Sequence, residues 1–92
     1  MDVVGILKKY KKKIKNDYAV EKIGIFGSFA KGNQTESSDI DILVEFKDPT
    51  YDNFIDLAFY LEKLYGKKID LITVKGLSPY ILPFVEKEVI WC

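Results

Sequence analysis

The stretch 26–46, FGSFAKGNQTESSDIDILVEF, decides the fold because it joins a glycine-serine turn to an apolar strand that carries two carboxylates. Side chains at positions i and i+2 of a strand point to the same face, so Asp39 and Asp41 stand side by side. The isoleucines beside them point to the opposite face. Two unpaired carboxylates raise each other's pKa, whereas a divalent cation favours both ionised forms. The spacing therefore predicts a two-carboxylate site, with Mg²⁺ as the simplest occupant.

A third carboxylate lies in a second apolar run. Residues 67–74, KKIDLITV, are predicted to form a strand, and Asp70 stands between its isoleucine and leucine. If this strand lies beside the one at 39–46, Asp70 completes a cluster of three acidic groups that can hold two metal ions. Mg²⁺ is usually held by one or two carboxylates together with substrate phosphates and water. The cluster therefore favours a nucleotide substrate and a phosphoryl transfer.

The glycine-serine turn supplies the other half of such a site. Gly27 lets the chain turn sharply after the strand at 21–26. Within residues 28–34, Ser28 opens a short helix that Gly32 and Asn33 stop, and the first amides of this helix are free to bind a phosphate. The Ser28 hydroxyl can add a further contact. Glycine-serine turns are common, so the functional interpretation depends on the position of this one directly before the carboxylate strand.

Apolar periodicity places the remaining elements. Helical spacing predicts a helix over 2–16 and another over 52–65 that ends at Gly66. A last helix is predicted over 77–89, with Ser78 as N-cap, Pro79 at the first helical position and Pro83 bending or shortening it. Helices alternate with strands and no linker interrupts residues 1–92, so we expect a single α/β domain with helices packed on a small mixed sheet of three to four strands.

Composition narrows the chemistry further. The chain of 92 residues has no histidine, which excludes histidine bases, nucleophile activation by histidine and histidine metal ligands. Its 14 basic and 14 acidic residues cancel, which gives no reason to expect direct nucleic-acid binding. Cys92 is the only cysteine, and no apolar run is long enough for a membrane span or a signal peptide. We therefore expect a cytoplasmic protein without membrane association.

Several features have a less specific interpretation beside the functional one. The six lysines of the first helix are more typical of a solvated face than of docking to RNA or to an acidic partner. A calcium loop is disfavoured because Ile40 and Ile42 leave no run of oxygen ligands and the necessary glycine is missing. A solvated strand edge would also explain the aspartates, but then three segments would have to mimic a site by chance.

The composite motif resembles that of a known superfamily. The motif is similar to the signature of the DNA polymerase β-type nucleotidyltransferases. It consists of a hydrophobic residue, then Gly27 and Ser28, then a short spacer, and then Asp39-Ile40-Asp41. Four segments together resemble the minimal nucleotidyltransferases (MNT group) of HEPN/MNT toxin-antitoxin modules. These segments are GSFAKG, SDIDILV, KIDLIT and GLSPYI. The resemblance covers nearly the whole chain.

This resemblance implies a polymerase β-like nucleotidyltransferase fold and a role for each motif residue. It implies that the triphosphate is contacted by Gly27, Ser28, Lys31 and Ser38. It also implies that the catalytic residues bind Mg²⁺, as two ions when the nucleotide is bound, and these residues are Asp39, Asp41 and Asp70. Asp70 is expected to help activate the incoming hydroxyl. Lys31 stands where the group commonly has arginine, so the positive charge is kept while bidentate phosphate binding is lost.

The resemblance also implies a reaction and a partner. The expected activity is Mg²⁺-dependent transfer of a nucleoside monophosphate, AMP from ATP, to a hydroxyl, namely a tyrosine of a helical HEPN-type toxin. The chain would then be the antitoxin. The alternative is an antitoxin that neutralises its partner by complex formation alone, without turnover. Two points remain open: whether another NTP is the substrate, and whether the chain forms a homo-oligomer.

Overall fold

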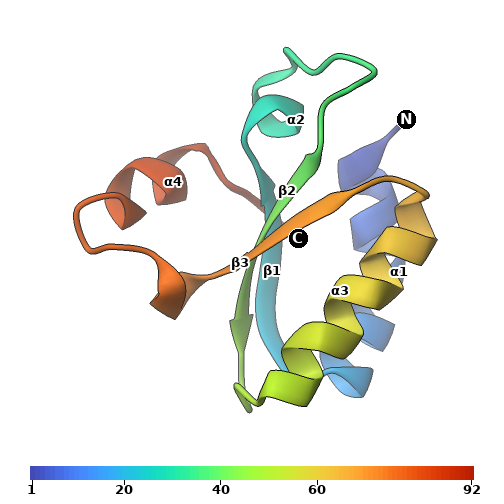
Figure 1. The fold of residues 1–92 in the computed structure, drawn as a ribbon, viewed down its shortest axis with the longest axis vertical. Coiled ribbons are helices and arrows are strands. Elements are labelled where there is room, and N and C mark those ends of the chain that lie inside the picture. Colours follow the sequence, from blue (N-terminus) through green and yellow to red (C-terminus); the bar gives the residue numbers. More distant parts are fainter.

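The centre of the fold is a four-stranded mixed sheet, seen in a computed structural model that describes all residues, 1–92. Its strands are β1 (Val20–Phe26), β2 (Ile40–Phe46), β3 (Ile69–Thr73) and β4 (Ile90–Trp91), in the order β3-β2-β1-β4 (Figure 1). β2 runs parallel to β3 and antiparallel to β1, and β4 runs antiparallel to β1. The expected α/β class with a small mixed sheet is confirmed.

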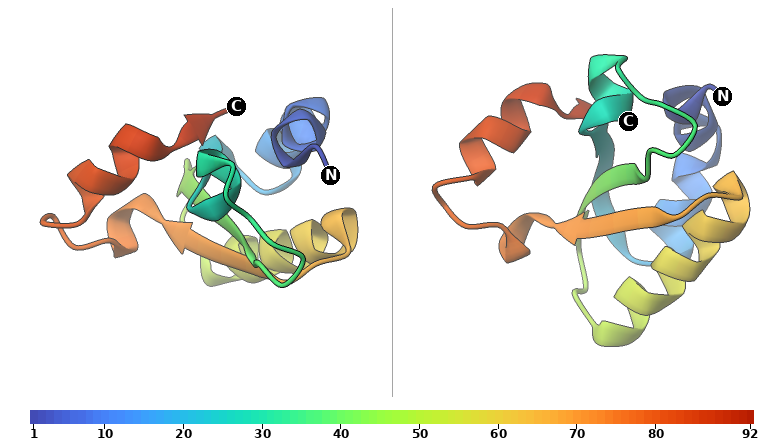
Figure 2. Two further views of the ribbon diagram at one scale, coloured as in Figure 1. Left: turned by 90° about the horizontal axis from the view of Figure 1, so that it is seen from above. Right: turned by 45° about the horizontal axis from the view of Figure 1, so that its top comes forward.

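Two long helices, α1 (Val3–Asp17) and α3 (Tyr51–Tyr65), lie next to each other on one face of this sheet (Figures 1 and 2). The buried Tyr65 hydroxyl donates a hydrogen bond to the Val3 carbonyl at 2.8 Å and so links the two helices. The hydrophobic core between helices and sheet consists of Val3, Leu7, Ile14, Val20, Ile23, Ile25, Ile40, Ile42, Val44, Phe46, Leu57, Leu61, Tyr65 and Ile69.

The opposite face of β2 carries the other alternate residues, beginning with Asp41. Leu43 on this face is fully buried but lies outside the main core cluster. The short helix α4 (Leu82–Glu88) lies on the other side of the strands from α1 and α3 (Figure 2). Its one buried residue is Val85. As expected from the alternation, the carboxylate of Asp41 and the apolar side chains of Ile40 and Ile42 are on different faces of the sheet.

Local side-chain and glycine caps fix the two long helices. The Asp2 carboxylate accepts a hydrogen bond from the Gly5 amide at 2.9 Å, and the Thr50 hydroxyl accepts one from the Asn53 amide at 3.1 Å. Gly66 ends α3 in the left-handed conformation. Both helices lie where the apolar periodicity predicts them. None of the helices is long and apolar enough to cross a membrane.

The last helix begins later than its sequence predicts. Ser78 does not cap it; the Ser78 carbonyl instead accepts from the amides of Ile81 and Leu82 at 3.0 and 2.9 Å and closes a separate turn. α4 then starts at Leu82, with Pro83 in its first turn. Proline has no amide hydrogen and its ring clashes with the carbonyl four residues earlier, so it fits a helix start and not a helix interior. Of the two effects expected of Pro83, the structure shows the shortening: the helix starts one residue before it, at Leu82.

The third strand is shorter than the predicted range 67–74, because a single 3₁₀ turn, η1 (Val74–Gly76), follows Thr73. The Thr73 hydroxyl accepts from the Gly76 amide at 3.0 Å and stabilises this turn.

The fourth strand depends on a glycine of β1. A Cβ atom on Gly24 would lie 2.7 Å from the Ile90 carbonyl oxygen and 2.8 Å from Cγ2 of Val89. The bare backbone of Gly24 therefore lets β4 pair closely with β1. Lys22 Nζ lies 4.5 Å from the centre of the Trp91 ring, which covers this strand pair.

Candidate active site

The glycine-serine turn leaves the end of β1 in a conformation that favours glycine. Gly27 has φ 72° and ψ −147°, a region that side-chain-bearing residues almost never occupy. Its carbonyl accepts hydrogen bonds from the amides of Ala30 and Lys31, each at 3.1 Å. Gly27 is thus the N-cap of a one-turn helix, α2 (Ser28–Lys31). Gly32 ends this helix in the left-handed conformation, so the predicted stop at Gly32 is confirmed.

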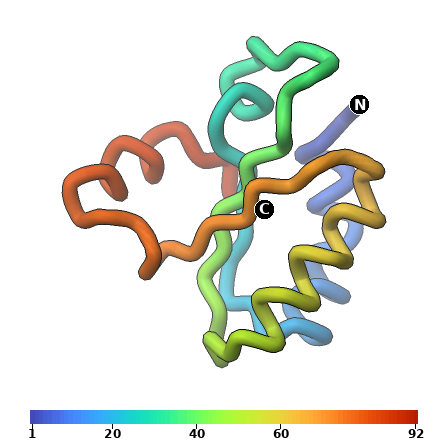
Figure 3. Tube along the Cα trace, viewed as in Figure 1, coloured from blue at the N-terminus to red at the C-terminus, as the bar shows by residue number.

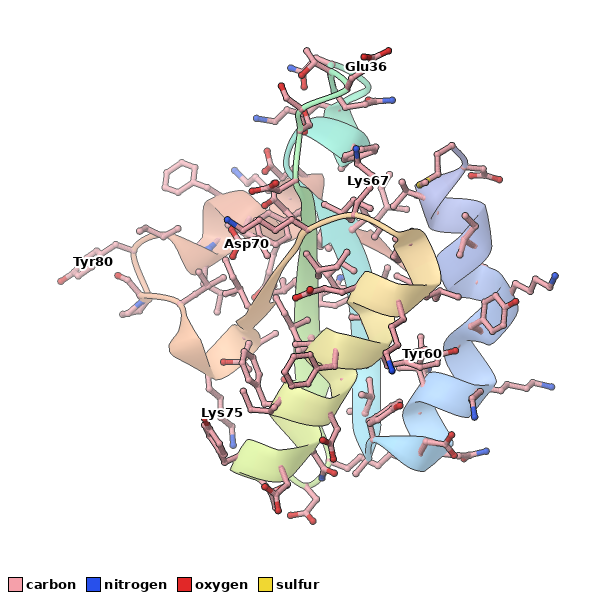
Figure 4. All side chains as sticks on the ribbon, turned by 45° about the vertical axis from the view of Figure 1, so that its right-hand side comes forward. Glu36, Tyr60, Lys67, Asp70, Lys75 and Tyr80 are labelled. Carbon is pink, nitrogen blue, oxygen red and sulfur yellow. The ribbon has the colours of Figure 1, made fainter.

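Strand register brings two of the predicted aspartates together. Phe26 of β1 pairs with Asp41 of β2, and Asp41 pairs with Asp70 of β3, so the three positions form one row across the sheet. The condition on which Asp70 joins the site, that the third strand lies beside the second, is met. Figure 4 labels Asp70 on β3.

The Asp41 carboxylate lies against the backbone of Gly27. A Cβ atom built on Gly27 would overlap Oδ2 of Asp41 and would lie 3.0 Å from its Cγ. The glycine turn and the carboxylate row therefore form one continuous site. The Asp41 carboxylate can lie this close to the backbone of residue 27 only because glycine has no side chain.

The third aspartate occupies a less enclosed position. Asp39 is exposed and precedes β2, which begins at Ile40, so it does not belong to the strand as the sequence predicts. The pairing with β3 nevertheless begins here, because the Ile40 amide donates to the Lys68 carbonyl at 3.1 Å. Asp39 is near enough for its charge to act on Asp41.

The environment of Asp41 raises the pKa of its carboxyl group above the ordinary aspartate value. Burial is the largest cause, and the charge of Asp70 and a hydrogen bond to its carboxyl group come next. The charges of Asp39 and Glu88 add to the effect. The sequence predicts repulsion between the aspartates, and the structure adds that desolvation contributes more to the raised pKa.

The two further residues predicted to bind phosphate have protein partners in the structure. Lys31 Nζ lies 3.2 Å from Oε2 of Glu88 on α4. Ser38 accepts a hydrogen bond from the Thr35 amide at 2.9 Å and closes a turn in the 32–39 connection between α2 and β2 (Figure 3). The Ser28 hydroxyl, by contrast, has no hydrogen-bond partner within the chain. Glu88 was not predicted from the sequence, because its partner is 57 positions away and no local pattern marks the pair.

The donor set of this site fits a hard divalent cation bound jointly with a ligand. Asp41 and Asp70 offer carboxylate oxygens on neighbouring strands, which Mg²⁺ prefers over nitrogen or sulfur. No three acidic side chains converge closely enough to form a ready-made metal cage. Mg²⁺ typically takes one or two carboxylates and completes its shell with phosphates and water. The residues therefore suit a cation that arrives with a phosphate-bearing substrate.

A pocket of about 250 Å³ lies elsewhere, beyond the other end of β3. Its walls include Phe46, Tyr51, Phe54 and Lys75, and Lys75 is labelled in Figure 4 at the opposite end of β3 from Asp70. It contains none of the aspartates. The carboxylate row therefore does not line this pocket.

The nucleotidyltransferase domain family matches residues 7–92 of the chain. The protein adenylyltransferase MntA of Thermococcus cleftensis is 38% identical over 91 residues, which cover 98% of this chain and 92% of that protein. A solved structure described as a candidate minimal nucleotidyltransferase is 28% identical, with a TM-score of 0.79, and the match covers 95% of this chain and 93% of that one.

Toxin-antitoxin complexes contain further chains of the same fold. A chain of a complex solved with AMP-PNP is 25% identical, with a TM-score of 0.74, over 91% of this chain and 70% of that chain. A chain of the Shewanella oneidensis complex between a tri-AMPylated HEPN toxin and its MNT antitoxin matches at 22% identity, with a TM-score of 0.67, over 99% of this chain and 71% of that chain. The chain belongs to the nucleotidyltransferase domain family, and within it to the minimal nucleotidyltransferases found in toxin-antitoxin modules.

Proposed function

We propose that this protein is a Mg²⁺-dependent adenylyltransferase that transfers AMP from ATP to a tyrosine hydroxyl of a HEPN-type toxin and thereby acts as its antitoxin. The observation that supports this proposal most strongly is the row of Phe26, Asp41 and Asp70 across three adjacent strands, with the Gly27 turn directly after Phe26. The names of the relative from Thermococcus cleftensis and of the Shewanella oneidensis complex support the protein acceptor.

Each residue of the row has a role in this reaction. The Gly27 turn and the free Ser28 hydroxyl receive the triphosphate, and Asp39, Asp41 and Asp70 are the residues that would hold Mg²⁺, two ions when the nucleotide is bound. Bound Mg²⁺ would supply charge stabilisation at the phosphates and at the leaving group. Asp70 orients the acceptor hydroxyl and takes its proton. The acceptor oxygen forms a bond to the α-phosphorus while the bond from that phosphorus to the pyrophosphate oxygen breaks, and pyrophosphate leaves.

The first test is a calorimetric titration of the purified protein with ATP, with and without Mg²⁺. We expect Mg²⁺-dependent binding that the double variant Asp39→Asn, Asp41→Asn weakens at least about tenfold, which is about 1.4 kcal/mol. The exposed pair Asp52→Asn, Asp56→Asn on α3 removes the same charge away from the site and serves as control. ATP binding that is unchanged both by the absence of Mg²⁺ and by the Asp39, Asp41 substitutions would contradict the proposed site.

The same double variant separates catalysis from binding in the antitoxin role. If AMP transfer neutralises the toxin, the variant must fail to protect cells that express the HEPN-type partner, and intact-mass analysis must show no AMP on that partner. Full protection by a variant that still forms the complex would instead support neutralisation by complex formation alone.

We further propose that the protein acceptor contacts an exposed apolar surface before and within α4. The side chains of Tyr80, Ile81 and Phe84 are 84%, 53% and 71% exposed, and Tyr80 points away from the sheet in Figure 4. Clustered exposed aromatic residues are typical of protein interfaces. α4 also brings Glu88 to Lys31, so this surface is continuous with the nucleotide site.

Replacing Tyr80 and Phe84 by serine is expected to slow AMP transfer to the protein acceptor about tenfold, because buried aromatic anchors typically contribute 1–2 kcal/mol or more to binding. ATP binding should not change. Phe59→Ser removes an aromatic side chain that is 60% exposed on α3 and should leave the transfer rate intact. If the wild type dimerises in solution and the Tyr80, Phe84 variant is monomeric, the surface binds a second copy and the acceptor contact is wrong.

A further inference from the structure

One ion pair of the chain lies within the candidate active site. Lys31 Nζ on α2 is 3.2 Å from Oε2 of Glu88 on α4, whereas the other two ion pairs are Lys13–Asp17 within α1 and Lys47–Glu21 on the surface. The Lys31 side chain is 55% exposed and that of Glu88 30% exposed. The pair is therefore open to solvent and to an incoming ligand.

Glu88 also acts on the carboxylate row. Its charge is among those that raise the pKa of Asp41, and its carboxylate pairs with Lys31, so Glu88 lies near both residues. A triphosphate that approaches the Gly27 turn meets this carboxylate and the ammonium group of Lys31 together. The ammonium group attracts the phosphates, but the Glu88 carboxylate already pairs with it.

We infer that Glu88 and the nucleotide triphosphate compete for Lys31, so that Glu88 sets the affinity of this site for ATP. The inference rests on the proposed function. Lysine carries a compact charge on a flexible stem, so Lys31 can exchange one anionic partner for another without rebuilding the site. Half-exposed ion pairs are weak, and the pair with Glu88 can therefore be broken by a multiply charged ligand held close to it. Glu88 acts only through Lys31, as a competitor for its ammonium group, and is not a catalytic residue.

Calorimetry with Mg²⁺ and ATP as the probe tests this competition in five proteins: wild type, Glu88→Gln, Lys31→Met, the double variant Lys31→Met, Glu88→Gln, and Glu86→Gln. We expect Glu88→Gln to bind about 3- to 10-fold more tightly than the wild type, because Lys31 is freed. Lys31→Met should bind at least about fivefold more weakly. In the Lys31→Met background, the Glu88 change should have no effect on affinity.

The matched control is Glu86→Gln, which makes the same change of charge two residues away on α4. Glu86 is exposed and makes no ion pair, so its removal should leave the affinity for ATP unchanged. Circular dichroism melts of all five proteins verify that each variant is folded at the titration temperature.

Three results would overturn the inference. Weaker ATP binding by Glu88→Gln would mean that Glu88 orients Lys31 toward the phosphates. Binding equal to that of Glu86→Gln would mean that no competition exists. A gain that persists in the Lys31→Met background would mean simple repulsion that does not involve Lys31. If ATP binding requires Asp39 and Asp41 but ignores Glu88, only this inference fails. If neither the wild type nor Glu88→Gln binds ATP with Mg²⁺, the proposed function and the inference fail together.

Discussion

Replacing Asp41 by asparagine is expected to lower AMP transfer more than about 100-fold while raising the melting temperature of the protein at neutral pH. The loss follows from the position of Asp41, which pairs with Asp70 in the sheet register and lies against Gly27. If Asp41 holds Mg²⁺ as proposed, its replacement removes the charge stabilisation that the metal would supply. Transfer to the HEPN-type partner, followed by intact-mass analysis, measures this effect.

The gain in stability follows from the raised pKa of Asp41. Burial, followed by the neighbouring Asp70, makes the folded protein hold this proton more tightly than the unfolded chain does. The stability that protonation contributes is complete below the unfolded pKa, close to the ordinary value of 3.8, and is lost as pH rises through the raised folded pKa. Asparagine is neutral throughout. The melting-temperature difference between variant and wild type should therefore be near zero in acid and grow toward pH 7.

Thermal melts in the presence of EDTA, at intervals from about pH 3.5 to about pH 7, measure this difference. For a chain of this size, each 1 kcal/mol corresponds to roughly 4–8 °C. The control is Asp56→Asn, which makes the same chemical change at an exposed position of α3 and should show no such pH-dependent gain. A variant that is less stable than the wild type at neutral pH would show that Asp41 is not a destabilising buried charge in the folded protein.

The sequence predicts those parts of the structure that local chemistry determines. Apolar residues at helical spacing, together with Gly66, predict α1 and α3 because each helix buries one continuous face. The alternation around Asp41 predicts its separation from the core residues. Its proximity to Asp70 can be predicted only under the assumption that β2 and β3 are neighbours, which the structure confirms.

Features that depend on contacts between distant segments are not predicted. β4 has two residues and exists because Gly24, far away in the sequence, leaves room for its backbone. The late start of α4 follows from Pro83, whose effect depends on where the chain must turn before it. The partner of Lys31 is likewise fixed only once α4 returns to α2. A motif that is identified correctly from the sequence therefore does not show which charged residues surround it in the fold.

Gly27→Ala is expected to be the most damaging change outside the carboxylates, with a loss of AMP transfer of more than about 100-fold. The added methyl group would overlap the Asp41 carboxylate, so Asp41 must leave its place in the row beside Asp70. The backbone at φ 72° and ψ −147° is also strained for alanine, which adds a stability cost of about 1–3 kcal/mol. Transfer assays below the melting temperature of the variant separate the loss of geometry from unfolding.

Two further variants determine how this loss arises. Gly66→Ala adds a methyl group at another positive φ, 64°, but meets no atom within 4 Å, so it should lower stability and leave transfer intact. Asp41→Ala removes the carboxylate that the Gly27 methyl group would strike. Gly27→Ala should therefore cost less stability in the Asp41→Ala background than in the wild type, and the difference is the energy of the clash. If Gly27→Ala lowers stability equally in the two backgrounds, backbone strain alone explains the requirement for glycine. The close contact between the turn and Asp41 then does not contribute to that requirement.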